Sequence, residues 1–518
     1  MATELSRREL LKKSFKIGAV LGGVAILGTG TYRFLKVPSI EDLYGTYPDG
    51  AADYPLRRSD TQAVAPNVII VCCDDLGYGD LGCYGNQALR TPAIDNLATT
   101  GSRFTEYYAC SAVCAPSRAG LLTGRYPFRT GIIGNPFPKE EPYTRVLARK
   151  VGDALKGIGV LDTRENVSGM GLSEIEITMA EGLKKAGYRT GMVGKWHLGD
   201  YNKQPEFNPR RHGFDTYFGV PHSNDMIPCP LFRNEEMLEE DIGTNQARLT
   251  GLYTKEALAF IEESAPGPFF LYFAHTFPHQ PLYASEAFEK QSMAGLFGDT
   301  VEEIDWSVGE IVKRLREKGL EYNTLIIFSS DNGPWYEGSP GSFRGRKGQS
   351  YEGGFRVPFI AAWPETIPAG RVSNTPFMNL DLYPTLFHLA GVELPGDRII
   401  DGRNIYQLLT GEDDKAPHEA IFFYHYDILE GVRMGRWKYF ERINRYVWPV
   451  PMDAAPIPDA LGKKQMGNRW PLLYDLENDP GENYNVINTY PDVARRLKST
   501  MDAWERAARR DPRGFAKG

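Results

Sequence analysis

The chain has 518 residues, of which 42% are hydrophobic and 24% are charged, and these proportions exclude a disordered or fibrous protein. Its 59 Lys and Arg residues stand against 66 Asp and Glu residues, and the net charge of −7 argues against a nucleic-acid-binding protein. Six cysteines in a chain of this length are too few for a scaffold built on disulfides. The negative net charge does not attract anions, so an anionic substrate must be bound by a local basic site.

The N-terminus has the pattern of an export signal. Arg7 and Arg8 precede an uncharged, mostly apolar run, Ile17–Tyr32, and this order resembles a signal read by the twin-arginine translocation machinery. The run is shorter than the about 20 residues of a membrane span, and no clear cleavage site follows it, so an N-terminal membrane anchor is the alternative. We predict a signal or anchor at 1–36, a linker at 37–64, and an exported protein of the periplasm or cell envelope.

Short apolar runs alternate with amphipathic segments between residues 65 and 410. The runs predict buried parallel strands, and the segments Glu174–Ala186 and Thr300–Lys318 predict helices between them. The predicted strands are Asn67–Cys73, Tyr188–Val193, Phe269–Ala274, Thr324–Phe328 and Phe359–Trp363. This alternation predicts an α/β domain with one large, mostly parallel sheet flanked by helices.

The pattern changes after residue 410. Short strands are predicted at Ile421–Tyr426, Gly431–Phe440 and Leu472–Leu476, and a closing helix at Pro491–Arg510. We therefore expect the catalytic domain to span 65–410 and a smaller α+β subdomain to span 411–518.

Polar side chains follow four of the predicted strands. Ligands of open α/β sheets bind beyond the carboxyl ends of the strands, so these residues are expected at one edge of the sheet. They are Asp74 and Asp75, Lys195 and His197, His275 and His279, and Asp331 and Asn332. The carboxylates and the amide are oxygen donors of the kind that hard cations bind, and Ca²⁺ is favoured over Mg²⁺.

A second signal lies in residues 114–125, Cys-Ala-Pro-Ser-Arg-Ala-Gly-Leu-Leu-Thr-Gly-Arg. Pro116 suits the first turn of a helix and Gly124 suits its end, so Cys114 is placed at a helix N-terminus, where free N–H groups favour an anion. Arg118 lies one turn further on and can bind paired oxygens of a sulfate or phosphate. From these residues alone, a capped helix with a buried cysteine is equally consistent.

The motif Cys114-Ala-Pro-Ser-Arg118, with Leu-Leu-Thr-Gly after it, matches the signature of the type I sulfatases. Four further blocks match the family in its order, and the resemblance runs from about residue 66 to residue 486. These blocks are the segment around Asp74-Asp75, Gly194-Lys195-Trp-His197, Ser329-Ser-Asp331-Asn332 and Gly345-Arg-Lys347-Gly, and the hallmark Leu473–Pro480 closes the series. The chain therefore resembles formylglycine-dependent sulfatases with an alkaline-phosphatase-like fold, most closely the branch of arylsulfatase A and N-acetylgalactosamine-6-sulfatase.

The resemblance implies hydrolysis of a sulfate ester to an alcohol and sulfate. In that family a separate formylglycine-generating maturation enzyme oxidises the cysteine, here Cys114, and the hydrated aldehyde attacks sulfur. One Ca²⁺ per chain is implied, held by Asp74, Asp75, the group at Cys114, Asp331 and Asn332. The implied catalytic residues are Cys114, Arg118, Lys195, His197, His279 and Lys347, and the substrate contacts are Ser223, Lys195, His279 and Lys347. Within this set, His197 acts on the second hydroxyl and His279 protonates the leaving oxygen.

Two other functions stay open at this point. A phosphatase or phosphodiesterase of the same superfamily would be favoured by a Ser or Thr nucleophile and a His-rich two-metal site, and both Cys114 and Asn332 argue against it. A non-catalytic binder of sulfated glycans would require that Cys114 is never matured. The expected substrate is a sulfated carbohydrate, small or polymeric, or an aryl sulfate, and no nucleic-acid partner is expected.

Overall fold

The computed structural model describes residues 45–48, 54–59, 65–138, 171–264, 266–443, 456–458, 464–466 and 471–515. The predicted signal at 1–36 and most of the predicted linker at 37–64 lie outside these residues. No helix in the described part of the chain is long and apolar enough to cross a membrane. The boundary between residues 410 and 411 stays a prediction.

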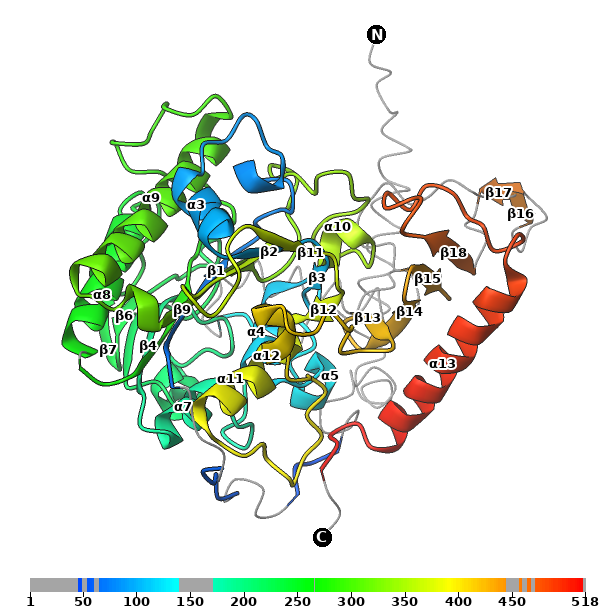
Figure 1. Cartoon of the computed structure of the whole chain (residues 1–518), viewed down its shortest axis with the longest axis horizontal. Helices are drawn as coiled ribbons and strands as arrows, with labels where there is room; N and C mark the ends of the chain where they lie inside the picture. The colour runs from blue at the N-terminus through cyan, green and yellow to red at the C-terminus, as the bar shows by residue number, and fades with distance from the viewer. Residues whose placement is uncertain are drawn as a thin grey trace, which may run out of the picture.

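A ten-stranded sheet forms the centre of the molecule, in the order β11-β2-β10-β9-β1-β8-β4-β5-β6-β7 (Figure 1). Its five middle strands, β9 to β5 in that order, pair in parallel. These are β1 (Asn67–Cys73), β4 (Arg189–Lys195), β5 (Thr216–Val220), β8 (Phe269–Ala274) and β9 (Thr324–Ser330). The predicted α/β fold with a large, mostly parallel sheet is confirmed.

The sheet becomes mixed toward its edges. The strand predicted at Phe359–Trp363 exists as β10 (Phe359–Ala362), but it runs antiparallel to both β9 and β2, so the expectation of a parallel strand there is wrong. A buried apolar run does not report strand direction, because both faces are covered either way. The remaining edge strands are β2 (Ser102–Phe104), β6 (Leu231–Arg233), β7 (Glu236–Glu239) and β11 (Arg371–Ser373).

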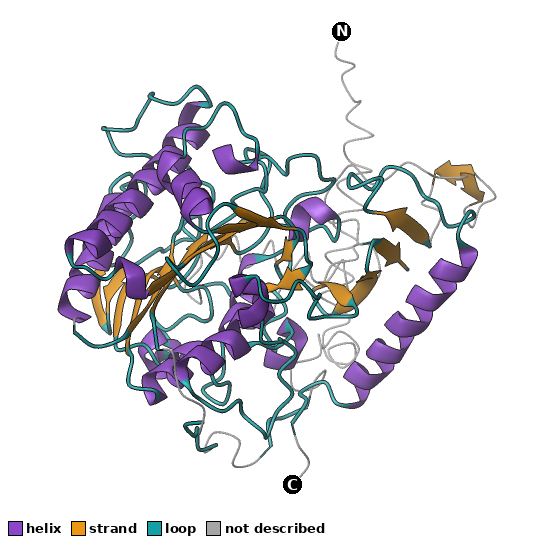
Figure 2. Ribbon diagram, in the orientation of Figure 1, coloured by secondary structure: helices purple, strands orange, loops and turns teal. Residues whose placement is uncertain are grey.

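Helices cover both faces of the sheet, as Figure 2 shows. Alternate residues of β1 face opposite cores, so Ile70 packs with α4, α7 and α11, and Val71 packs with α3, α8 and α9. The first group is α4 (Cys114–Thr123), α7 (Met179–Lys185) and α11 (Leu382–Ala390), and the second is α3 (Pro92–Thr100), α8 (Leu249–Ser264) and α9 (Gly295–Glu317). Cys72 and Cys73 belong to these two cores.

Two of the predicted helices begin at residues other than those predicted from the sequence. The helix α7 begins at Met179 and not at Glu174, because Thr178 caps it in a reciprocal pair with Glu181. The helix α9 begins five residues before Thr300. The short elements are α5 (Pro127–Thr130), α10 (Glu352–Phe355), α12 (Tyr406–Thr410), β3 (Tyr107–Tyr108), β12 (Phe377–Met378), β16 (Pro456–Pro458) and β17 (Lys464–Met466).

A separate antiparallel sheet lies toward the C-terminus, in the order β13-β14-β15-β18, and the helix α13 (Pro491–Arg510) packs against it (Figure 1). The single strand predicted at Gly431–Phe440 is wrong. It contains the end of β14 and all of β15, separated by a turn at Gly435 with a φ of 56°. The four strands are β13 (Ile421–His425), β14 (Ile428–Met434), β15 (Trp437–Phe440) and β18 (Leu472–Asp475).

Candidate active site

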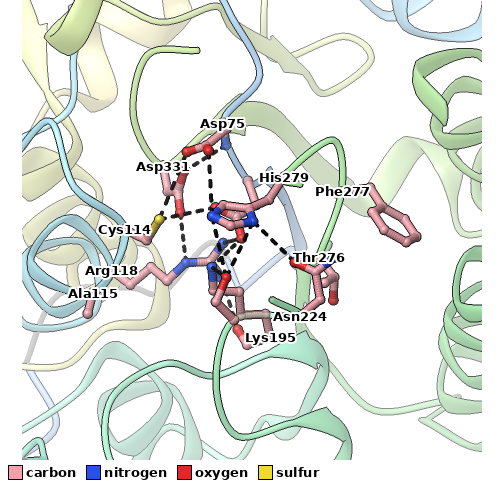
Figure 3. A network of polar contacts seen from close by, with 12 residues as sticks. Asp75, Cys114, Ala115, Arg118, Lys195, Asn224, Thr276, Phe277, His279 and Asp331 are labelled. Atoms are coloured by element: carbon pink, nitrogen blue, oxygen red, sulfur yellow. Dashed lines mark hydrogen bonds and ion pairs between the residues drawn. The ribbon is translucent and has the colours of Figure 1, made fainter. Parts of the chain in front are cut away.

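The four predicted strand ends are neighbours, because β9, β1, β8 and β4 lie side by side in the sheet. Asp331 and Asn332 follow β9, Asp74 and Asp75 follow β1, His275 follows β8, and Lys195 ends β4. Figure 3 shows Asp75, Cys114, Arg118, His279 and Asp331 gathered around one point. The parallel order of the sheet thus brings the polar residues of four strands to one edge.

Cys114 is the first residue of α4, and an extended Val113 leads the chain into the helix. Its Sγ lies 3.2 Å from Oδ1 of Asp74 and 3.9 Å from Oδ1 of Asp75. Arg118, one turn later and fully buried, donates from Nε to Oδ2 of Asp331 at 2.8 Å and from Nη1 to the Lys195 carbonyl at 2.9 Å. These two hydrogen bonds fix the Arg118 guanidinium, which lies below Cys114 in the view of Figure 3.

Two lysines bring further positive charge to the same place. Nζ of Lys195 pairs with Asp74 and donates to Oγ of Ser223 at 3.2 Å. Nζ of Lys347 lies 2.9 Å from Oδ2 of Asp75, although Lys347 comes from a distant loop. Burial opposes the charge of Asp74, but Lys195, His279 and Arg118 hold the pKa of Asp74 well below its usual range.

The oxygen donors fit a hard cation. One ligand atom each from Asp74, Asp75, Cys114 and His279 lies within 4.8 Å of the others. Asn332 donates from Nδ2 to Oδ1 of Asp75 at 2.7 Å, while its own Oδ1 is buried and has no hydrogen-bond partner among the described residues. Such an orphaned acceptor is costly unless a cation or water pairs with it.

Asp331 joins the donor group through Asp75, whose backbone N–H donates to its Oδ1 at 3.3 Å. Burial and the negative charge of Asp74 raise the pKa of Asp331 to about 7, and Arg118 offsets this only in part. Carboxylates gathered at this density repel one another, and a divalent cation removes that repulsion. The group of possible metal ligands also includes His279, although the sequence analysis predicts that His279 acts as the acid and not as a ligand.

The histidines occupy distinct environments. His197 is fully buried in a left-handed backbone conformation with a φ of 60°, and neither ring nitrogen has a hydrogen-bond partner in the described structure. Burial and the charge of Lys195 hold the pKa of His197 well below its usual range. Strained backbone of this kind concentrates at functional sites. His275 is buried among aromatic rings and accepts from the Phe277 N–H at 3.0 Å, so it lies behind the site.

His279 faces the donor group from the side that solvent reaches. Its ring lies 3.7 Å from Oδ2 of Asp75, 3.4 Å from Oγ of Ser223 and 3.2 Å from Oδ1 of Asn224. Burial and the charge of Lys347 lower the pKa of His279. The side chains of His279 and Lys347 are each 12% exposed, whereas Arg118 and Lys195 are completely enclosed.

Sequence reasoning did not single out Asn224 or its neighbour Asp225. Asn224 donates to the Pro281 carbonyl at 3.1 Å and to Oε1 of Gln246 at 3.0 Å, which fixes its oxygen against His279. Both residues follow β5, which lies beside β4 but was not among the predicted strands. Recognition of that fifth strand end is the signal that would have found them. His222, in the same segment, pairs with Asp200 at 3.3 Å.

The model of the sulfatase family matches residues 66–392, and a model of the C-terminal region of aryl-sulfatase matches residues 416–518. The chain belongs to the sulfatase family. A third model, of the N-sulphoglucosamine sulphohydrolase C-terminus, matches residues 341–448. The predicted family is therefore confirmed.

Curated relatives of this sulfatase span most of its length. The N-acetylgalactosamine-6-sulfatase of Homo sapiens is 36% identical over 473 residues, covering 85% of this chain and 86% of the relative. The arylsulfatase of Hemicentrotus pulcherrimus is 35% identical over 502 residues, covering 90% and 86%. The steryl-sulfatase of Mus musculus is 32% identical over 534 residues, covering 86% and 81%. The chain is thus a sulfuric ester hydrolase, as predicted.

Two solved structures share the fold of this sulfatase. A protein of a Bacteroides thetaiotaomicron locus for metabolism of glycosaminoglycans aligns with a TM-score of 0.70 and 30% identity, covering 85% of this chain and 99% of that one. Ps i-CgsB in complex with k-i-k-neocarrahexaose aligns with a TM-score of 0.69 and 27% identity, covering 88% and 95%.

Proposed function

We propose that this sulfatase hydrolyses sulfate esters through a formylglycine derived from Cys114, assisted by one bound Ca²⁺. The observation that carries the proposal is the position of Cys114: it begins α4, lies beside Asp74 and Asp75, and has Arg118 fixed beneath it. An unmodified thiol is poorly suited to this role, because burial and the charge of Asp74 raise the pKa of Cys114 well above its usual range.

The chain's own residues divide the work as follows. The hydrated aldehyde supplies the nucleophilic hydroxyl and a route for release of sulfate. Arg118, Lys195 and Lys347 bind the negative oxygens, and their fixed positions mean that little reorganisation is needed as charge develops. His197 is buried, and both its ring nitrogens are without a hydrogen-bond partner among the described residues, so it can orient the second hydroxyl of residue 114. His279, with Ser223, lies on the solvent-facing side and protonates the leaving oxygen.

The cation would be held by Asp74, Asp75, Asp331 and Asn332, with the group at residue 114 completing the set. Bound there, Ca²⁺ supplies Lewis-acid polarisation of a sulfate oxygen. The clustered buried carboxylates and the orphaned Asn332 oxygen support this assignment. Arg118, Lys195 and Lys347 are paired with the carboxylates of Asp331, Asp74 and Asp75, so the cation would supply the net positive charge that a monoanionic sulfate ester requires.

The substrate class that we propose is a sulfated carbohydrate. Two similar proteins support this class: an N-acetylgalactosamine-6-sulfatase, and Ps i-CgsB in complex with k-i-k-neocarrahexaose. An aryl sulfate is the second candidate, supported by the arylsulfatase relative. With the paired arginines near the N-terminus, we propose export through the twin-arginine machinery to the periplasm or cell envelope, after maturation of Cys114 by a formylglycine-generating enzyme.

Mass spectrometry of the tryptic peptide Phe104–Arg118 tests the central claim. Protein from a host with the maturation enzyme should show a peptide about 18 Da lighter, with the change at Cys114 and not at Cys110. Cys114→Ala should abolish hydrolysis of 4-nitrophenyl sulfate, while Cys110→Ala, the matched control from a neighbouring buried cysteine, should retain it. An intact Cys114 in fully active enzyme, or a faster reaction with 4-nitrophenyl phosphate, would overturn the proposal.

A further inference from the structure

A tight turn carries Asp225 past the active site. The Met226 N–H donates to the Ser223 carbonyl at 3.1 Å and closes the turn. The two residues before Asp225 face the site, since Oγ of Ser223 lies 3.2 Å from Nζ of Lys195 and Oδ1 of Asn224 lies 3.2 Å from His279. Asp225 itself is exposed at the tip of the turn.

The turn places the charge of Asp225 directly after Ser223 and Asn224, which contact Lys195 and His279 of the site. The surrounding protein partly desolvates this carboxylate and opposes its ionisation, but His279, the Ser223 hydroxyl, Lys195 and Lys347 together lower the pKa of Asp225. The carboxylate is therefore ionised at neutral pH, close to the groups that receive the sulfate. It differs from Asp74 and Asp75 in being open to solvent, whereas those two are buried.

An exposed anion beside an anion-binding site weakens attraction of the sulfate itself. The placement of Asp225 is explained if its carboxylate acts on the alcohol part of the substrate, which stays outside the site that binds the sulfate. A carboxylate accepts hydrogen bonds from hydroxyl groups and repels a second negative charge. The buried lysines bind the sulfate whichever alcohol carries it, so discrimination between alcohols must come from accessible groups such as this one.

We propose that Asp225 is a specificity-determining residue that favours neutral, hydroxyl-bearing alcohols and disfavours alcohols with a second anionic group beside the scissile ester. This inference rests on the proposed sulfate-ester hydrolysis and narrows its substrate class. The residue has no part in the bond-breaking step. Its removal therefore changes the preference between substrates, and not the chemistry common to all of them.

The test compares two aryl esters with wild-type enzyme and the isosteric variant Asp225→Asn, which suits the same turn. One substrate is 4-nitrophenyl sulfate, and the other carries a ring carboxylate beside the ester. The variant should raise kcat/KM for the carboxylate substrate relative to the neutral one by about threefold or more, and 0.5 M NaCl should reduce this change because the charge is exposed. Intrinsic reactivity cancels, because each ratio is compared between enzymes.

Glu236→Gln is the matched control: it removes one exposed carboxylate on β7 and should leave the ratio unchanged. A ratio that moves less than about threefold in Asp225→Asn, or equally in Glu236→Gln, overturns the inference but leaves the proposed function standing. Wild-type enzyme that carries formylglycine and cleaves neither ester would overturn the proposed function, and the inference with it.

Discussion

Nζ of Lys347 and Oδ2 of Asp75 form a 2.9 Å ion pair between residues 272 positions apart in the chain. The loop after β9 is therefore held over the end of β1, and the Lys347 N–H donates to the Pro334 carbonyl at 3.0 Å, which fixes the backbone as well. A lysine held in this way stabilises negative charge without reorganisation.

Replacement of that charge should impair catalysis more than folding. Lys347→Met should lower kcat/KM for 4-nitrophenyl sulfate by about 10²–10³-fold, the usual effect of losing one fixed stabiliser of developing charge. Lys313→Met, on the exposed face of α9, is the control and should stay near wild type. Steady-state kinetics measure both variants, and a loss of kcat/KM of less than about tenfold in Lys347→Met would show that Lys347 is not a catalytic residue.

Metal removal should be visible both in activity and in stability. A cation bound only by the folded state raises the free energy of unfolding by about 2.7 kcal/mol at a concentration of 100 Kd. Exhaustive chelation should therefore lower Tm and abolish activity, and added Ca²⁺ should restore both. Asn332→Ala should raise the Ca²⁺ concentration for half-maximal activity at least about tenfold. Metal content measured beside Tm provides the check, and a metal-free enzyme with unchanged Tm and activity would contradict the assignment.

The sequence predicts much of this structure because its signals are local. The strand Phe269–Ala274 and the helix Pro491–Arg510 have the predicted bounds, since continuous apolar runs and a strong amphipathic period are independent of the rest of the fold. The direction of β10 and the strand β5 were missed. Direction depends on long-range pairing, and Thr216–Val220 is a short strand whose apolar run Gly219 interrupts.

The candidate site could likewise be predicted only in part from the sequence. Residues directly after strongly apolar strands, such as Asp74 and Asp331, could be placed at one edge from topology alone. The contact of His279 with Asn224 could not, because it depends on the conformation of two loops. The pairing of Lys347 with Asp75 is also beyond local reasoning, and the family motif supplied that residue where physical argument did not.

His279 should matter most for esters with poor leaving groups. His279→Ala should reduce kcat for an alkyl or sugar sulfate at least about tenfold more than for 4-nitrophenyl sulfate, whose phenolate leaves without protonation. Because burial and the charge of Lys347 lower the pKa of His279, the acid form is lost as pH rises through a value below 6.5 in the free enzyme. The kcat/KM of the alkyl substrate should therefore fall with rising pH. Equal losses on both substrates would exclude His279 as the acid.

Lys438 connects the C-terminal sheet to the helix α10. Its Nζ on β15 lies 2.8 Å from Oε1 of Glu352 in α10 and 3.1 Å from Oε1 of Glu482, and all three side chains are fully buried. Lys438→Met leaves the buried Glu482 without its cation, and leaves Glu352 with Arg356 at 3.3 Å, so it should lower the free energy of unfolding by about 3–5 kcal/mol. Lys498→Met, which removes a half-exposed lysine from α13, should cost under about 1 kcal/mol. Urea unfolding measures both, and similar losses would refute the role of Lys438.

His212 should make the protein sensitive to mild acid. It is fully buried beside Trp196, with ring centroids 5.4 Å apart, and burial lowers the pKa of His212 from 6.5 to about 4. The unfolded chain therefore binds a proton between these values that the folded chain does not. Stability is retained above pH 6.5 and is lost as pH falls toward 4, by about 2 kcal/mol between pH 7 and pH 5.

His212→Gln removes this titration. Its Tm at pH 7 should fall below that of wild type because the packing of the buried imidazole on Trp196 is lost, but the further decrease between pH 7 and pH 5 should be smaller. His388→Gln is the control, because His388 is exposed on α11 and its replacement should preserve the wild-type decrease. Calorimetry at the two pH values measures both differences. A decrease in His212→Gln as large as that of wild type would show that His212 does not account for the acid sensitivity.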